Sequence, residues 1–243
     1  DITDNHVNKP RRIQFDVKDF TSVPLSECIK RDRSRTGTAR VGRGVIERMA
    51  LTAGLIDLSV YNTVAIVDVD GTLANLDHRL HYIQTEPKDH ESFFRDAVLD
   101  SPFVSIFHAV HQLQDAGWTV IVLSGRPTDT GYDTDSWLRG YEYYTEWGGI
   151  GFDPVHLFMR QSVDHRPDNE IKYQLMESML TAGLRKDAIK IVIDDRESIC
   201  AVWRSLDLPL VKVDHGAAIE IHPSVLKLVI DIGIPVNGVS TGV

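Results

Sequence analysis

The sequence predicts an α/β fold in which a parallel β-sheet is flanked by helices. Two observations predict it: short β-branched runs alternate with segments of helical periodicity over residues 64–213, and several of these runs end in acidic or small polar residues. Strands that alternate with helices form right-handed crossovers, which make the strands parallel and bring their carboxyl ends to one edge of the sheet. A functional site is therefore expected at that edge.

The expected elements follow one another without an internal repeat. They are strand Val64–Val67, a helix over about 103–113, strand Thr119–Leu123, a strand at about Val155–Met159, a helix from about Asp168 to Ala182, strand Lys190–Ile193, helix Glu197–Leu206 and strand Leu210–Val213. Apolar side chains recur at helical spacing in the first helix, and Gly117 lies just past its end. Asp168 or Asn169 is the expected N-cap of the second helix, and Gly183 its stop. The partly apolar tail after Gly216 receives no assignment.

The composition is that of an ordinary soluble globular protein. The chain has 243 residues, enough for one substantial α/β core and a smaller appendage. No apolar run approaches membrane-spanning length and nothing resembles a signal peptide, so no membrane partner is expected. Cys28 and Cys200 lie far apart without a CxxC motif, which argues against a zinc site or a disulfide framework. A reducing, cytoplasmic setting is predicted.

The charge of the chain is unevenly distributed. The formal net charge is −9, although residues 1–60 carry 11 basic side chains against 8 acidic ones. A net negative protein is not expected to bind nucleic acid with its whole surface. Contact with a polyanion would therefore use local arginine clusters.

The first expected strand leads directly into Asp68-Val69-Asp70-Gly71-Thr72-Leu73. Two acids separated by one residue point the same way in extended backbone, and such a pair needs a compensating cation. The hexapeptide resembles DxDGT, the first motif of the haloacid dehalogenase (HAD) superfamily of phosphotransferases. That resemblance implies a Rossmann-like sheet and phosphoryl-transfer chemistry. The alternative interpretation of this one motif is an acidic turn that closes a strand.

Three further motifs follow in the order that a phosphoryl-transfer site of this type requires. The second strand ends in Ser124-Gly125-Arg126, whose hydroxyl, backbone N–H groups and guanidinium suit a phosphate ester. Lys172 lies on the next expected helix, where its ammonium would neutralise the nucleophile and the transferred group. Asp194-Asp195 ends a later strand and offers oxygen ligands to Mg²⁺. Each motif is weak alone, but their agreement in order is specific.

These parts predict a two-step phosphatase mechanism. Asp68 is the expected nucleophile and forms an aspartyl-phosphate, while Asp70 acts as general acid and then as general base. Mg²⁺ is expected to bind Asp68, the backbone carbonyl of Asp70, and either Asp194 or Asp195. An acid rather than a threonine at position 70 favours a phosphatase over a P-type ATPase.

A narrower resemblance extends over residues 63–216. Leu157-Phe158-Met159-Arg160, the segment Asp164–Lys172, and Ile193–Glu197 followed by Val202-Trp203-Arg204 resemble the 3′-phosphatase domain of phage-type polynucleotide kinase–phosphatases. The resemblance implies the following roles: Asp68 as nucleophile, Asp70 as acid and base, Arg79 and Arg126 as substrate contacts, Asp168 and Lys172 as supports of the site, and Asp194 and Asp195 as essential acids near the metal. For Arg79, a surface arginine is an equally open interpretation.

The N-terminal part resembles the C-terminal portion of the 5′-kinase domain of the same enzymes. The likeness lies in Asp16–Phe20, Val23–Arg35 and Val45–Met49, where Arg31 and Arg35 would match nucleotide-binding arginines of the kinase lid. The chain contains no GxxxxGK[ST], so no kinase activity is expected from it. We therefore predict two parts: residues 1–60, a small α/β remnant of a P-loop kinase domain that either packs on the rest or is partly ordered, and residues 61–243, a HAD-type 3′-phosphatase domain.

The predicted function is an Mg²⁺-dependent polynucleotide 3′-phosphatase that repairs RNA or DNA 3′-phosphate ends. The insert between the first two motifs is no larger than a helical hairpin, and an open site suits a polymer end. The alternatives are a HAD phosphatase for a small phosphomonoester such as a nucleotide, and a non-catalytic scaffold, against which the intact acids argue. Trp137, Tyr141, Tyr143, Tyr144 and Trp147 are either base-stacking or core side chains. Family analogy predicts a homo-oligomer, while the choice between RNA and DNA stays open.

Overall fold

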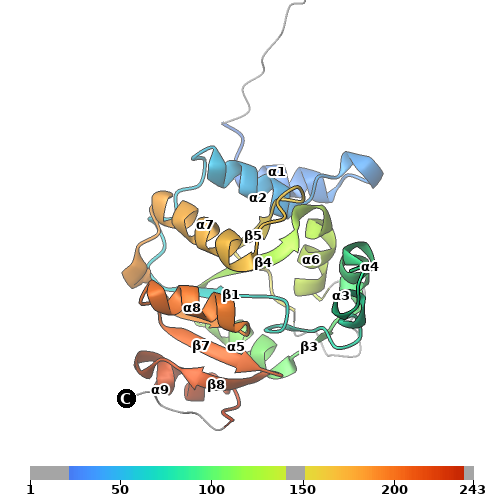
Figure 1. The fold of residues 1–243 in the computed structure, drawn as a ribbon. Helices are drawn as coiled ribbons and strands as arrows, with labels where there is room; N and C mark the ends of the chain where they lie inside the picture. Colours follow the sequence, from blue (N-terminus) through green and yellow to red (C-terminus); the bar gives the residue numbers. More distant parts are fainter. Residues whose placement is uncertain (1–21, 141–150, 238–243) are drawn as a thin grey trace, which may run out of the picture.

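A six-stranded sheet forms the centre of the protein (Figure 1). The structure is a computed structural model that describes residues 22–140 and 151–237. The sheet has the order β5-β4-β1-β6-β7-β8, and every neighbouring pair is parallel except β7 and β8. The strands are β1 Val64–Val67, β4 Thr119–Pro127, β5 His156–Arg160, β6 Ile189–Asp194, β7 Leu210–Asp214 and β8 Ala217–Ile221, while β2 Ala74–Asn75 and β3 Ser101–Pro102 form a separate antiparallel pair.

Helices cover both faces of this sheet and confirm the predicted fold class. They are α1 Leu25–Arg33, α2 Arg43–Thr52, α3 His81–Gln84, α4 His90–Arg95, α5 Val104–Asp115, α6 Gly131–Leu138, α7 Asp168–Thr181, α8 Glu197–Ser205 and α9 Leu226–Asp231. None of the helices in the described ranges combines the length and the apolar character needed to cross a membrane.

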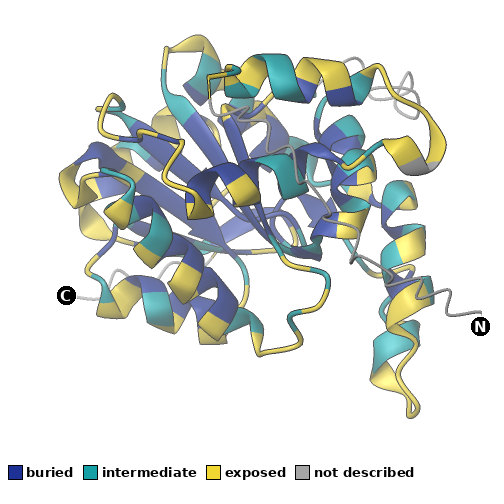
Figure 2. Cartoon of the chain, turned by 90° about the horizontal axis from the view of Figure 1, so that it is seen from above, coloured by how far each residue is buried: buried dark blue, intermediate teal, exposed yellow. Residues whose placement is uncertain are grey.

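The alternation of side chains along the central strand divides the core in two. Val64 and Ile66 point to one face, where they pack with buried side chains of α2, α7 and α8. Ala65 and Val67 point to the other face, towards α5, α6 and α9. Figure 2 shows the resulting pattern, with dark blue strands between helices that are yellow on their outer sides. A strand buried on both faces reads as a continuous apolar run, which is what residues 64–67 are.

The strand order places a crevice at the carboxyl end of β1. From β1 the chain moves outward on one side through β4 and β5, and then returns to form β6 on the other side of β1. Connections that leave a strand in opposite directions open a gap above the sheet edge, where ligands of open α/β sheets bind. Asp68 follows β1 and Asp194 ends β6 at this switch point.

Two boundaries near the carboxyl edge of the sheet differ from the expected ones. Strand β4 does not end at Leu123 but continues to Pro127, with a register shift against β5 between Ser124 and Pro127. The N-cap of α7 is Pro167, not Asp168 or Asn169, and it makes no side-chain capping bond. Asp168 is instead the first helical residue, and its carboxylate contacts Arg160 and Arg196. A side chain engaged by two arginines is not available to cap its own helix.

The tail after Gly216 completes the sheet and the core. His215 and Gly216 both have positive φ and join β7 to β8, which matches a two-residue hairpin turn of type I′. Strand β8 is therefore antiparallel, unlike the parallel arrangement that the sequence predicted for the sheet. Val225 and Val229 are buried in the core on the α5 side.

The described part of residues 1–60 packs on the sheet. Ala50, Leu51 and Leu58 belong to the same buried cluster as α7 and α8. Arg43 of α2 donates to the backbone carbonyls of Pro154 at 2.6 Å and Val155 at 2.8 Å, just before β5. Residues 22–60 contain helices and no strand, so the α/β character expected of a kinase remnant is absent from them, while residues 1–21 lie outside the described ranges.

Candidate active site

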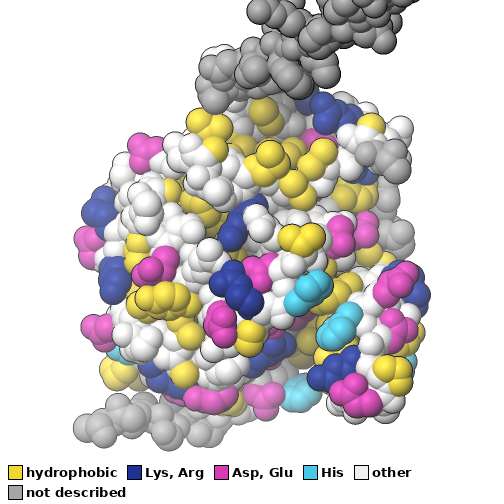
Figure 3. Space-filling view, turned by 45° about the horizontal axis from the view of Figure 1, so that its top comes forward, with side chains coloured by type: hydrophobic (Ala, Val, Ile, Leu, Met, Phe, Trp, Pro, Cys, Tyr) yellow, Lys and Arg dark blue, Asp and Glu magenta, His cyan; other side chains and the backbone are white. Residues whose placement is uncertain are grey.

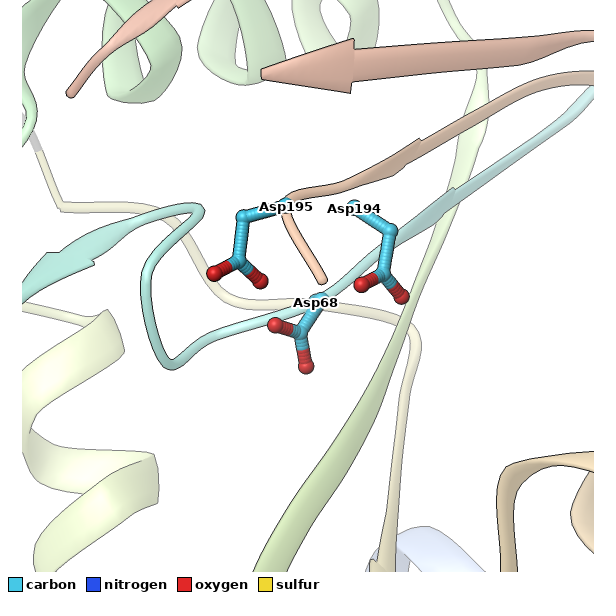
Figure 4. Close-up of side chains that lie close together, drawn as sticks. All are labelled: Asp68, Asp194 and Asp195. Atoms are coloured by element: carbon cyan, nitrogen blue, oxygen red, sulfur yellow. The ribbon is translucent and has the colours of Figure 1, made fainter. Parts of the chain in front are cut away.

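Three carboxylates meet at the carboxyl ends of β1 and β6. Asp68, Asp194 and Asp195 each offer an oxygen, and these oxygens lie within 4.8 Å of one another. Figure 4 shows the three side chains facing a common space. The Nζ of Lys172, on the first half of α7, lies 2.6 Å from Oδ1 of Asp68 and 2.8 Å from Oδ2 of Asp194. The structure thus brings together the first, third and fourth motifs of the sequence.

One ammonium does not neutralise three acids. Burial raises the pKa of Asp68 to about 8, with Asp194 and Asp195 adding to the shift against the opposing charge of Lys172. Burial and Asp194 likewise raise the pKa of Asp195 to about 6. For Lys172, burial alone would lower the pKa, but Asp194 and Asp68 outweigh it and the pKa is raised. The cluster therefore holds an excess of negative charge.

The same cluster has the features of a divalent-cation site. Oδ1 of Asp195 is buried and has no hydrogen-bond partner in the structure. Asp194 is fixed by Trp203, whose Nε1 donates to Oδ2 at 3.1 Å. Gly71 passes so close to Asp195 that any side chain there would collide with its carboxylate, and its φ of +87° also favours glycine. A free carboxylate oxygen beside two further acids suits an oxygen-loving cation such as Mg²⁺.

Asp70 lies in a second network, with two buried arginines. Its Oδ1 accepts hydrogen bonds from Nη2 of Arg79 at 2.8 Å and from Nε and Nη2 of Arg126 at 2.8 and 2.7 Å. Arg79 is completely enclosed, so the interpretation as a surface arginine is wrong. Burial alone would raise the pKa of Asp70, but Arg126 and Arg79 hold it at about 2. Asp70 is therefore ionised in this arrangement at neutral pH.

Asp100 holds both arginines and was not identified from the sequence. It accepts from Nε and Nη2 of Arg79 at 2.6 and 2.7 Å, and from Nη2 of Arg126 at 2.6 Å. Nε2 of His78 lies 2.9 Å from it. Asp100 is a lone acid next to β3, with no motif around it, so only the tertiary fold reveals its role.

The Ser124-Gly125-Arg126 motif lies inside the irregular end of β4. Oγ of Ser124 is buried and accepts the Arg126 N–H at 3.1 Å, so this hydroxyl fixes the backbone that carries the arginine. Gly125 borders the cavity, where a Cβ would come within 3.0 Å of Oδ1 of Asp168. Glycine therefore leaves room between β4 and the start of α7.

A cavity of about 680 Å³ opens in front of these residues. Asp68, Asp70, Lys172 and Asp195 are among the residues that line it. The insert contributes to the lining through its helices α3 and α4, which contact each other and supply side chains that include Ile83, His90 and Phe94. Arg160 at the end of β5, His165 before α7 and Arg196 before α8 line it too. On the face drawn in Figure 3, basic, acidic and histidine side chains are intermixed. Arg79 and Arg126 do not line the cavity, so their contact with substrate stays a prediction.

Some of the expected residues lie elsewhere. Arg31 and Arg35 are exposed on and after α1, and Arg31 pairs with Glu27 at 2.7 Å. Trp137 is a core residue: it is buried, it packs edge-on against Phe107, and its Nε1 donates to the carbonyl of Asp100 at 2.9 Å. The other aromatic residues proposed for stacking, at positions 141–147, lie outside the described ranges.

Comparison with known proteins gives one matching family model and several similar solved structures. The family model described as the polynucleotide kinase PNKP phosphatase domain matches residues 62–217. Two solved structures, described as the Pnkp1/Rnl/Hen1 complex and the Pnkp1/Rnl/Hen1 RNA repair complex, are 24% and 27% identical with TM-scores of 0.47 and 0.49. The matches cover 64% and 65% of this chain but 47% and 44% of those chains, so this chain spans less than half of their length. A predicted phosphatase from Clostridium acetobutylicum is 16% identical with a TM-score of 0.45, over 73% of this chain and 93% of that one.

Proposed function

This chain belongs to the family of polynucleotide kinase PNKP phosphatase domains, and on that premise we propose that it is an Mg²⁺-dependent polynucleotide 3′-phosphatase. Its substrates are RNA or DNA ends that carry a 3′-phosphate, and its product is a 3′-hydroxyl end fit for repair. The observation that carries the proposal is the position of Asp68. Its carboxylate is buried at the end of the central strand, touches Lys172 and faces a cavity together with Asp195.

The proposed reaction has two steps. A carboxylate oxygen of Asp68 attacks the phosphorus, the bond from phosphorus to the 3′ oxygen breaks, and an aspartyl-phosphate forms. Water then attacks this phosphorus, which releases inorganic phosphate and restores Asp68. Lys172, at 2.6 Å, stabilises the ionised form of Asp68 that the first step needs. When Mg²⁺ is bound by Asp68, the backbone carbonyl of Asp70 and Asp194 or Asp195, it supplies positive charge that offsets their repulsion of the phosphate.

Asp70 is the proposed acid and base, and its surroundings impose a condition on that role. The carboxylate accepts from Arg79 and Arg126 and is ionised, which suits the base that takes a proton from water in the second step. To protonate the leaving 3′ oxygen in the first step, Asp70 must gain a proton. A phosphate dianion entering the cavity favours that gain, because a nearby like charge raises the pKa of a carboxyl group.

The proposal extends to residues 1–60 as the C-terminal portion of a phage-type kinase domain, with Arg31 and Arg35 as lid residues. The resemblance of Cys28–Arg35 supports it, as does the exposure of both guanidinium groups. No kinase activity is expected of this chain because GxxxxGK[ST] is missing from it. Calorimetric titration with ATP, compared between the wild type and Arg35→Gln, tests the lid assignment. The cytoplasmic setting and the homo-oligomer stay predictions.

The deciding experiment is phosphate release from a 3′-phosphorylated oligonucleotide, with Mg²⁺ and with EDTA. The same assay is run on a matched nucleoside 3′-monophosphate and on a generic aryl phosphate. Metal-dependent release with a strong preference for the oligonucleotide supports the proposal. Equal or faster turnover of the two small esters would retain the chemistry but replace the substrate by a small phosphomonoester.

A further inference from the structure

A buried positive charge outside the active site lies on the α7 side of the sheet, at Arg48 of α2. Arg48 is 9% exposed, and its Nε and Nη1 are buried without a hydrogen-bond partner. Within residues 22–140 and 151–237, the guanidinium of Arg48 forms no ion pair. The other three arginines buried as deeply, Arg43, Arg79 and Arg126, all contact carboxylates at 3.2 Å or less. Burying a guanidinium without a partner costs free energy, so binding of an anion at Arg48 would be favourable.

Arg48 borders a cavity of about 490 Å³ between α2 and α7, here called the α2–α7 cavity. Its lining residues are Arg48, Leu51, Thr52, Gly54, Gln161, Asp164, Arg166, Gln174, Glu177, Ser178, Thr181 and Ala182. Of its two acids, Asp164 is already bound by Arg166 at 2.6 and 3.0 Å, and Glu177 is exposed. The charge of Arg48 is therefore the uncompensated one in this cavity.

The pKa shifts of Arg48 and Arg43 show the same contrast as their ion pairs. Burial lowers the pKa of Arg48, and the charge of Asp164 does not make up for it. Burial acts on Arg43 too, but Glu47, Asp135 and Asp153 outweigh it and raise its pKa. Both arginines lie on α2, five residues apart, so the contrast reflects their partners and not their depth alone.

We propose that the α2–α7 cavity binds a phosphate, namely an internal phosphodiester of the strand whose 3′ end lies in the active site. This inference rests on the proposed function. Asp164 lines both cavities, so only the segment around it, residues 161–168, separates them. The planar guanidinium fork matches two phosphate oxygens, and the side-chain amide of Gln161 lines the same cavity and offers a further donor. The hydroxyls of Thr52 and Ser178 already donate to the backbone carbonyls of Arg48 and Gln174. A strand passing over this segment would thus be held at two points.

The kinetic test compares the wild type with Arg48→Gln on 3′-phosphorylated substrates of increasing length. We expect KM for the longer strands to rise about tenfold, the effect of losing one charge-assisted contact, with kcat unchanged. Turnover of the nucleoside 3′-monophosphate should stay within about twofold of wild type. Arg185→Gln is the matched control, because Arg185 is an exposed arginine that lines neither cavity. Equal KM values for the wild type and Arg48→Gln on every strand would overturn the proposal.

A binding arm keeps this inference separate from the proposed function. Affinity for a strand with a 3′-hydroxyl end, which cannot be hydrolysed, is measured over a range of salt concentrations. Arg48→Gln should weaken binding and reduce the salt slope by about one ion, whereas Arg48→Lys should keep most of that slope. If the wild type hydrolyses oligonucleotides but its strand binding does not depend on Arg48, the inference fails while the function stands. If the wild type does not hydrolyse oligonucleotides but strand binding depends on Arg48, the proposed function fails while the phosphate site at Arg48 stands.

Stability and free phosphate complete the test. Because Arg48 lacks partners, Arg48→Gln should unfold at the same temperature as the wild type or higher, while Arg43→Gln, which loses several ion pairs, should unfold lower. A marked fall in the melting temperature of Arg48→Gln would contradict an unsatisfied guanidinium.

Inorganic phosphate should raise the melting temperature of the wild type more than that of Arg48→Gln. Such a phosphate effect without any dependence of KM on strand length would overturn the strand assignment.

Discussion

At the scale of single residues, the orientation of Asp70 depends on Asp100. Each of the two arginines that bind Asp70 also binds Asp100, so the four side chains form one buried network. An arginine held by two carboxylates has little freedom to rotate, and misplacement of a reacting group by even about 1 Å can reduce the rate about a hundredfold. Asp100 is thus a positioning residue, because it does not line the cavity.

The substitution Asp100→Asn tests this role. It removes one of two negative charges facing two buried guanidinium groups, so we expect kcat to fall about a hundredfold and the free energy of unfolding to fall by about 3 kcal/mol. The pH profile of kcat should also shift, which a purely structural role would not cause, because the arginines then interact differently with Asp70. Asp96→Asn is the control, an acid of the same insert that pairs with Arg95 at its surface. A stable Asp100→Asn enzyme with wild-type kcat and pH profile would contradict the prediction.

Asp68→Asn tests the nucleophile itself. An amide does not form the acyl-phosphate, so phosphate release should fall to the background rate, while the circular dichroism spectrum and the cooperative unfolding of the protein are retained. The substitution removes one of three crowded acids, so no large loss of stability is expected. Substantial metal-dependent turnover by Asp68→Asn would rule out the aspartyl-phosphate mechanism.

Sequence reasoning identified those site residues that lie at the ends of strands. Asp68, Asp70, Asp194 and Asp195 follow buried β-branched runs, so their convergence at one sheet edge follows from the parallel topology. Asp100 and Arg48 have no such context: each is a charged residue that follows no expected strand, and its burial results from distant parts of the chain. Charged residues are rarely buried, so composition alone points away from both.

At the scale of elements, periodicity located the central strands and the main helices, and the ends of elements were less predictable. Residues 64–67 form β1 as expected, because a short apolar run between polar segments fits only a buried strand there. Strand β4 continues through Ser124-Gly125-Arg126, because the hydroxyl of Ser124 accepts a hydrogen bond from the backbone N–H of Arg126 inside the fold. Strand β8 was missed because its turn contains His215, a residue type with no strong turn preference, at positive φ.

The segment that ends at residue 60 was expected to belong to a separate domain, and its side chains test that division. Leu58 is completely buried in the cluster of α7 and α8, whereas Leu55, three residues earlier, is 51% exposed. We expect Leu58→Ala to lower the free energy of unfolding by about 3 kcal/mol and to shift one single transition. Leu55→Ala, the same change at an exposed site, should alter it by less than about 0.5 kcal/mol. A separate early transition in urea, with the main one unmoved, would indicate an independent N-terminal unit.

At the scale of the whole molecule, the fold brings three carboxylates together at the edge of the sheet where the proposed reaction takes place. The net charge is −9, and three acids of the cluster share one lysine. Folding brings these acids together from two strand ends, so the folded state carries a repulsion that the unfolded chain lacks. The pKa values of Asp68 and Asp195, raised to about 8 and about 6, report this repulsion together with burial. Stability, pH and metal binding should therefore be linked.

The sign of this linkage follows from where the protons reside. An acid whose pKa is higher in the folded state holds a proton that the unfolded chain has already released, so the metal-free protein should lose stability as the pH rises from about 4 through about 8. Mg²⁺ binds the ionised carboxylates and displaces these protons, so its stabilising effect should grow over the same interval. At about a hundred times its Kd, a ligand of the folded state adds about 2.7 kcal/mol.

Melting temperatures measured in EDTA and in excess Mg²⁺, at pH values from about 5 to about 8.5, test this linkage. The values in EDTA should decline with pH, those in Mg²⁺ should stay nearly level, and the difference should widen. Asp195→Asn removes one acid and the free Oδ1, so its decline in EDTA should be shallower and its response to Mg²⁺ weaker. A difference that is constant over this interval, or a metal-free protein that gains stability with pH, would show that the three carboxylates are not an unneutralised cation site. The charge excess at the sheet edge would then have to be balanced by a partner other than a metal ion.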